Sequence, residues 1–192
     1  MGTLTHNYLT TILCVRGLEG TVRHSNFKNR SYANRGMYLE RILEMANTKY
    51  RNAGIADIQK LPTPVKIMKV TGSKVEGVRT KGHLVDYLGI YKGVSLIFDA
   101  KETKDTRFPL QNIENHQYNL LKSWSEKGAV AFLIVYFAKY DKYFYLPFAS
   151  LKWAFERAEK GGRKSIAYEE FESCGQEIKS KDGYTLHYLE AI

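Results

Sequence analysis

The chain has 192 residues, and its 29 Lys and Arg against 20 Asp and Glu give a net charge of +9. This length suits one domain with a sizeable core, and the basic balance favours a polyphosphate partner such as nucleic acid. The two cysteines, Cys14 and Cys174, form no metal-ligand pattern and nothing indicates an oxidising compartment, so we expect free thiols in a cytoplasmic protein.

The first 31 residues predict a poorly ordered basic arm ahead of a single domain, residues 32–192. The apolar run Tyr8–Val15 is too short to span a membrane. It has neither a basic leader nor a small-residue cleavage site, so we expect neither a signal peptide nor a membrane partner. One interpretation is that the arm contacts DNA or a partner protein. The alternative is that it is disordered and has no function.

A helix is predicted to start near Asn34, which is a good N-cap residue. Its apolar stripe consists of Leu39, Ile42, Leu43 and Ala46. Glu40 borders this stripe, where it could lean toward other acids of a catalytic site. The alternative is a solvated partner for Arg35 or Arg41.

The stretch of residues 60–82 predicts a protruding two-stranded ribbon, which begins after Pro62-Thr63-Pro64 with an extended run. Its basic residues, set against the single acid Glu76, are Lys60, Lys66, Lys69, Lys74, Arg79 and Lys81. Glycines at 72, 77 and 82 leave little material for a core. The ribbon is interpreted as a DNA contact, with a merely solubilising hairpin as the alternative.

The stretch His83–Lys101 predicts an antiparallel hairpin, because two apolar, β-branched runs flank Tyr91-Lys92-Gly93. With Lys92-Gly93 as the loop, the numbers of paired residues sum to 185. Asp86 and Asp99 satisfy this sum, so they should face each other on one side of the hairpin. Lys101, two residues beyond Asp99, should share that side.

Two carboxylates at one position destabilise a sheet unless a cation compensates them. A Mg²⁺ ion would do so, since it prefers oxygen ligands and often bridges to phosphate. Such an ion can activate water and stabilise a scissile phosphate, with Lys101 supporting the transition state. The alternative is an exposed sheet face on which both acids pair with Lys101 alone.

The apolar residues from Leu110 to Trp124 recur at helical spacing, which predicts a helix with a buried stripe. Gln117 is the one polar residue in that stripe. As a buried amide it needs partners, either a metal site or backbone. The apolar run Ala129–Phe137 predicts a central strand, with Lys142–Leu146 as the neighbouring strand. Ser150 is the predicted N-cap of a helix that runs through Lys160.

Arg163 and Lys164 follow that helix, where they could touch phosphates or offset the helix dipole. The predicted fold is a single α/β sandwich with a mixed sheet and flanking helices.

Several motifs resemble, in order, the RecU family of Holliday-junction resolvases, which belongs to the PD-(D/E)xK nuclease superfamily. They are Asn34-Arg35-Gly36-Met37 with Leu39-Glu40, Pro62-Thr63-Pro64, Phe98-Asp99-Ala100-Lys101-Glu102-Thr103-Lys104, Phe108-Pro109-Leu110-Gln111-Asn112, His116-Gln117 and Gly162-Arg163-Lys164-Ser165-Ile166. The resemblance runs from about Tyr32 to the C-terminus.

The resemblance implies Asp86, Asp99 and Gln117 as metal ligands, Lys101 as the transition-state stabiliser and Glu40 as a further catalytic acid. Two positions depart from the family pattern. Asp99 stands where the family usually has glutamate, and Leu84 stands at a threonine ligand, so water would replace that ligand. These departures bear on metal affinity more than on the chemistry.

The expected function is therefore a Mg²⁺-dependent endonuclease, with Mn²⁺ as a substitute, that resolves four-way DNA junctions by paired symmetric nicks during recombination and repair. Symmetric nicks imply a homodimer. In the family the ribbon is a stalk that enters the junction. The expected DNA-binding residues are Arg35, Lys66, Lys69, Lys74, Arg79, Lys81, Arg163 and Lys164.

Recombinase and branch-migration proteins are the further partners that this expectation suggests. The alternatives are a duplex-cutting restriction-type nuclease and a DNA-binding recombination accessory factor with weak or absent nuclease activity.

Overall fold

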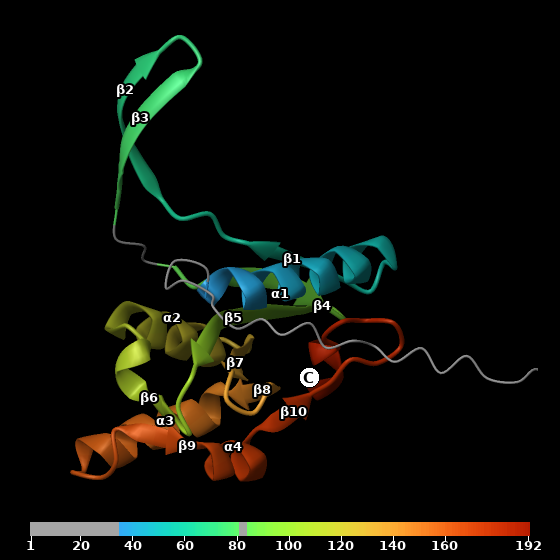
Figure 1. Cartoon of the computed structure of the whole chain (residues 1–192), viewed down its shortest axis with the longest axis vertical. Helices are drawn as coiled ribbons and strands as arrows, with labels where there is room; N and C mark the ends of the chain where they lie inside the picture. Colours follow the sequence, from blue (N-terminus) through green and yellow to red (C-terminus); the bar gives the residue numbers. More distant parts are fainter. Residues whose placement is uncertain (1–34, 81–83) are drawn as a thin grey trace, which may run out of the picture. The chain divides into compact units, whose positions relative to one another are not determined.

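The computed structural model describes residues 35–80 and 84–192, and its largest element is a six-stranded sheet (Figure 1). The strand order is β1-β4-β5-β7-β8-β10. The central pair β5–β7 is parallel and the other pairs are antiparallel, which confirms the expected mixed sheet. The bounds are β1 Ala56–Lys60, β4 Tyr87–Tyr91, β5 Val94–Thr103, β7 Val130–Phe137, β8 Lys142–Pro147 and β10 Gln176–Ile178.

Helices cover both faces of this sheet, because the buried central strands present apolar side chains to each side in turn. On β5, Leu96 and Phe98 join the core beneath α1 (Arg35–Asn52), whereas Ile97 joins the opposite core. That opposite core also packs α2 (Asn115–Ser125), α3 (Phe148–Glu159) and α4 (Tyr168–Cys174). The expected sandwich of helices around one sheet is therefore confirmed.

The first helix follows the predicted pattern. Its stripe of Leu39, Ile42, Leu43 and Ala46 is buried against the sheet. The C-terminal segment packs into the same core through the short helix η3 (Tyr188–Ala191). The position of Asn34, the predicted cap, lies outside the described residues.

The predicted hairpin register is confirmed from Tyr91↔Val94 to Tyr87↔Phe98, where the ladder ends one residue short of the expected Asp86–Asp99 pair. The turn residues Lys92 and Gly93 have φ angles of 49° and 78°. Both angles are positive, as a two-residue turn of type I′ requires, and this turn matches the twist of the strands it joins.

Residues 65–79 form a separate two-stranded ribbon, β2 (Val65–Thr71) with β3 (Lys74–Arg79), which shares no ladder with the large sheet. The described side chains on both strands are exposed. Lys60, which the sequence grouped with the ribbon, is instead the last residue of β1. The position of Lys81 is outside the described residues.

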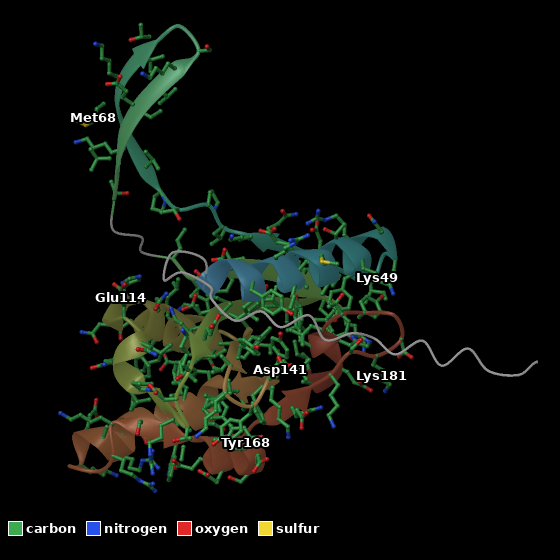
Figure 2. The ribbon with its side chains drawn as sticks, viewed as in Figure 1. Lys49, Met68, Glu114, Asp141, Tyr168 and Lys181 are labelled. Atoms are coloured by element: carbon green, nitrogen blue, oxygen red, sulfur yellow. The ribbon has the colours of Figure 1, made fainter. Side chains whose placement is uncertain are left out.

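A β-bulge sorts the ribbon into two unlike faces. The register steps between Ile67 and Lys69, which leaves Met68 (labelled in Figure 2) without a partner on β3. Directly paired residues share a face. One face carries Val65, Ile67, Val70, Val75 and Gly77, and the other carries Lys66, Lys69, Thr71, Lys74, Glu76 and Val78.

Two helix starts differ from the sequence-based expectation. Helix α3 begins at Phe148 directly after β8, so Ser150 is not its cap; the Ser150 hydroxyl donates instead to the Cys174 carbonyl at 3.0 Å. Leu110 lies in a 3₁₀ turn, η2 (Leu110–Asn112), between β6 (Arg107–Pro109) and α2. Strand β6 pairs with β9 (Ser165–Ala167), and this pairing draws residue 110 away from the helix.

The predicted N-terminal arm, with Cys14, lies outside the described residues. Cys174 is a free cysteine, as expected. Within the part of the chain that the structure describes, no helix combines the length and apolarity that a membrane span requires.

Candidate active site

Asp86 and Asp99 meet where β4 begins beside the middle of β5. The backbone N–H of Asp86 donates to Asp99 Oδ1 at 3.2 Å, and the backbone N–H of Ala100 donates to Asp86 Oδ2 at 3.1 Å. Each carboxylate is thus held by the main chain of the opposite strand. The β4–β5 ladder ends at Tyr87↔Phe98, so Asp86 and Asp99 lie just beyond it, and these two side-chain contacts bring them together.

The Asp99 side chain is fully buried, whereas Asp86 is partly exposed. Burial raises the pKa of the Asp99 carboxyl to about 8, and the bond to Asp86 acts in the same direction, while the Lys101 ammonium opposes both. A charge without water contact is unfavourable unless it is compensated. The site therefore favours an additional positive charge.

Lys101 supplies one positive charge. Its Nζ lies 2.8 Å from Asp99 Oδ2, with the Lys101 side chain 20% exposed. This contact is an ion pair rather than an aligned hydrogen bond, because Asp99 Oδ2 has no donor in hydrogen-bonding geometry. The buried carboxylate oxygen consequently keeps lone-pair capacity for another electrophile.

Gln117 reaches the same place from the first turn of α2. Its Oε1 accepts from Lys101 Nζ at 3.2 Å and from the backbone N–H of Glu114 at 3.1 Å. Glu114, labelled in Figure 2, is the N-cap residue of α2. The spacing Glu114-x-x-Gln117 is that of a capping box, a signal in the sequence that could have indicated the second contact.

The donors suit a hard divalent cation, which would compensate the two facing carboxylates. Throughout residues 35–80 and 84–192, no three side chains of Asp, Glu, His or Cys come together as a ready-made metal cluster. A cation held by Asp86 and Asp99 would take its remaining ligands from amide or backbone oxygens and from water. Leu84 has a side chain 53% exposed and contributes no polar atom from it.

Glu40 of α1 forms an ion pair with Lys60 at the end of β1. Its Oε2 accepts from Lys60 Nζ at 2.8 Å, and Glu44 lies 3.5 Å from the same ammonium. Lys60 pairs across the sheet with Tyr87, the neighbour of Asp86. Sequence reasoning placed Lys60 in the ribbon and so missed this ion pair, whose partners are 20 residues apart.

The expected DNA-binding residues fall into two described groups. Lys66, Lys69 and Lys74 share the polar face of the ribbon. Arg163 and Lys164 are exposed in the connection after α3, which turns at Gly161 with a φ angle of 84°. Arg35 and Arg79 are placed only as backbone in α1 and β3.

A family model described as "Recombination protein U", RecU, matches residues 34–192. A Pediococcus pentosaceus protein named Holliday junction resolvase RecU is 38% identical over 168 residues, which cover 84% of each chain. A Staphylococcus aureus protein of the same name is 34% identical over 182 residues, 91% of this chain and 88% of the relative.

Among solved structures, the Holliday junction resolvase Hjc of Archaeoglobus fulgidus aligns with a TM-score of 0.46 at 17% identity, covering 74% of this chain and 95% of Hjc.

Proposed function

Because the chain belongs to the RecU family of recombination proteins, we propose that it is an endonuclease that resolves four-way DNA junctions in the cytoplasm. The observation that carries the proposal is the opposed pair Asp86 and Asp99 with Lys101 beside it. This is the acid-acid-lysine arrangement of PD-(D/E)xK nucleases, and it lies inside the part of the chain that matches the family.

In this proposal Asp86 and Asp99 hold the metal, for which Mg²⁺ is the proposed ion and Mn²⁺ a substitute. When bound, the ion supplies an activated water and neutralises charge on the scissile phosphate. The two backbone N–H groups keep the carboxylates in place before the ion arrives. Lys101 offers its ammonium to the negative charge that develops on phosphate oxygen.

The polar face of the ribbon supplies the DNA contact. Lys66, Lys69 and Lys74 are exposed on that face, so phosphates can reach them without displacing any core. Arg163 and Lys164 would contact phosphates as well. Such contacts position DNA without reading its sequence, which leaves the shape of the junction to provide selectivity.

We also propose a twofold homodimer, since two symmetric nicks require two active sites. The apolar face of the ribbon supports this proposal. Val65, Ile67, Val70 and Val75 are all more than half exposed on it. An apolar strand pair left in water invites association, and a second copy of the same face is its natural cover. The lysines of both copies would then remain free for DNA.

Cleavage of a labelled four-way junction, with and without Mg²⁺, tests the proposed activity. We expect paired nicks that depend on the metal. Asp86→Ala should abolish nicking but leave junction binding nearly intact, because binding rests on many phosphate contacts. Metal-dependent cleavage by Asp86→Ala would contradict the site assignment. Junction binding without cleavage by the unaltered protein would instead indicate a recombination accessory factor, and equal cutting of linear duplex a restriction-type nuclease.

A further inference from the structure

Helix α3 carries a tryptophan on its outer surface. Trp153 is 55% exposed, whereas Leu151 and Ala154 on the inner side of the same helix are buried. An indole ring is the largest flat apolar surface that a side chain can offer, and aromatic rings of this kind dominate the energetics of many interfaces. Its place in the open raises the question of what binds there.

The ring is held in place by a neighbouring cation. Arg157 Cζ lies 4.6 Å from the centroid of the indole ring, one helical turn further along α3. The guanidinium is itself fixed, because it forms an ion pair with Glu170 and donates to the Ser165 carbonyl oxygen at 2.7 Å. The indole is thus preorganised, so a partner that stacks on it pays little for ordering the side chain.

A surface hollow of about 350 Å³ lies beside the ring. Its lining residues are Trp153, Glu156, Arg157, Lys160 and Gly162. Sites for small organic groups begin at about 300 Å³, so the hollow has room for a group the size of a nucleobase. A Cβ atom at Gly162 would lie 2.8 Å from the Arg157 carbonyl oxygen, so glycine lets the loop after α3 close against the helix.

Positive charge is in excess around this hollow. The exposed cations beside it that form no ion pair in the described part of the chain are Lys160, Arg163 and Lys164. The lining acid Glu156 lies 3.8 Å from Lys152 Nζ, and Glu170 is the partner of Arg157. The hollow therefore favours a negatively charged ligand that also carries a flat ring.

A single strand of DNA has both features. Its phosphates bind cations, and its bases, which have no complementary strand, can stack on an aromatic ring. A duplex offers phosphates to the same cations, but its bases are already stacked on one another. An acidic protein segment would satisfy the cations as well. DNA is favoured over such a segment because Arg163 and Lys164 already belong to the proposed phosphate contacts.

We propose that the hollow beside Trp153 is a binding site for unpaired DNA. Trp153 stacks on one base, and the phosphates on either side of that base bind Lys160, Arg163 and Lys164. The site shares no residue with the candidate active site, so it holds a strand without cutting it. It thus adds to the proposed nuclease function a contact for single strands, and it does not depend on that function.

Tryptophan fluorescence tests the stacking directly, because a stacked base quenches an indole. The sequence contains only Trp124 and Trp153, so Trp124→Phe leaves Trp153 as the single tryptophan. A thymine oligonucleotide of about 12 nucleotides, a length that one single-strand site spans, is titrated into this variant in EDTA. A duplex of the same length is titrated in parallel. We expect the single strand to quench the emission and the duplex to leave it nearly unchanged.

Anisotropy of the labelled oligonucleotide measures affinity with Trp124 in place. Trp153→Ala should weaken single-strand binding by about tenfold, as for other stacking rings, and duplex binding by less than about twofold. Trp153→Tyr keeps a ring and should recover most of the affinity. Met45→Ala removes an apolar side chain that is 54% exposed on α1, and it should change neither affinity. Lys160→Gln should flatten the slope of log K against log salt for the single strand by about 0.7.

Emission that the single strand does not quench would overturn the site. Equal losses on single strand and duplex in Trp153→Ala would also overturn it, and so would a loss of the same size in Met45→Ala. Unchanged affinities in Trp153→Ala would overturn it in favour of a protein segment as the ligand of this surface. All of these measurements are made without a divalent metal, so they leave the nuclease proposal standing. That proposal fails separately, if the unaltered protein never cleaves a junction in Mg²⁺.

Discussion

Asp99 combines two properties that conflict in the absence of a cation. It is fully buried, and a second carboxylate accepts a bond from the residue next to it. Burial and a like charge both disfavour the ionised form, which is why the pKa of this carboxyl rises to about 8. An arrangement that is unfavourable for folding and suited to binding a cation is characteristic of functional sites.

Asp99→Asn should therefore stabilise the free protein and abolish its response to metal. In EDTA we expect a melting temperature a few degrees above that of the unaltered chain, because one of two apposed acids is gone. With Mg²⁺ at a hundred times Kd, the unaltered chain should gain about 2.7 kcal/mol, which raises its melting temperature by roughly 5–10 °C.

Differential scanning calorimetry with and without Mg²⁺ measures both effects. Asp57→Asn, which removes an exposed carboxylate of β1, is the matched control and should keep the full response to Mg²⁺. An equal rise for Asp99→Asn and the unaltered chain would place the ion elsewhere.

At the scale of elements, the hairpin could be predicted from sequence and the ribbon only in part. The hairpin register follows from a two-residue turn and the strand period, both of which are local. The ribbon's strands were also predictable, but the bulge at Met68 was not. Without the bulge, Lys69 would share a face with Val65 and Ile67. The separation of the apolar face from the polar face therefore depends on one unpaired residue.

The contact of Gln117 with Lys101 and that of Glu40 with Lys60 could not be predicted from the sequence, for a related reason. Gln117 meets Lys101 across 16 residues, and Glu40 meets Lys60 across 20. Such pairs are set by how helices lie on the sheet, which no local pattern specifies. Acidic character and helix position were predictable for Glu40, but its partner was not.

Gly77 is the position on which the ribbon's pairing depends. A Cβ atom there would lie 2.5 Å from Val65 Cγ1 and 2.9 Å from the Lys66 carbonyl oxygen. Gly77→Ala should therefore open the ribbon and speed amide exchange in residues 65–71, measured by hydrogen–deuterium exchange. Global stability should change by less than about 1 kcal/mol, as for exposed positions away from the core. Val78→Ala should leave ribbon exchange unchanged, and intact protection in Gly77→Ala would contradict the argument.

The polar face of the ribbon should contribute to junction binding through its positive charges. Replacing Lys66, Lys69 and Lys74 with glutamine removes three positive charges without touching any core. Each lost phosphate contact should flatten the slope of log K against log salt by about 0.9. Fluorescence anisotropy at several salt concentrations, on a junction and on linear duplex, measures this slope.

We expect the loss to be larger for the junction, since a straight duplex has no central opening for the ribbon to enter. A triple variant at the exposed Lys127, Lys139 and Lys179 carries the same change of charge and should affect both substrates equally little. Equal losses for the ribbon variant on both substrates would make the ribbon a general phosphate contact.

At the scale of the whole molecule, the ribbon's two faces connect assembly to catalysis. Ile67 lies on the apolar face and Val78 on the polar face, and both are 59% exposed. The two residues therefore differ in the face they occupy but not in their exposure. If two apolar faces meet across a twofold axis, Ile67→Glu buries two like charges against each other, and the interface should weaken by at least tenfold in Kd. Val78→Glu adds the same charge outside that interface.

Sedimentation velocity across a concentration series measures the dimer, and a junction with each strand labelled distinguishes paired from single nicks. Ile67→Glu should dissociate and leave singly nicked junctions, because each monomer keeps its Asp86–Asp99–Lys101 site but has no partner to cut the opposite strand. Val78→Glu should remain dimeric, with only the weaker DNA binding that an added negative charge produces. Equal dissociation of both variants, or of neither, would show that the subunits meet through another surface.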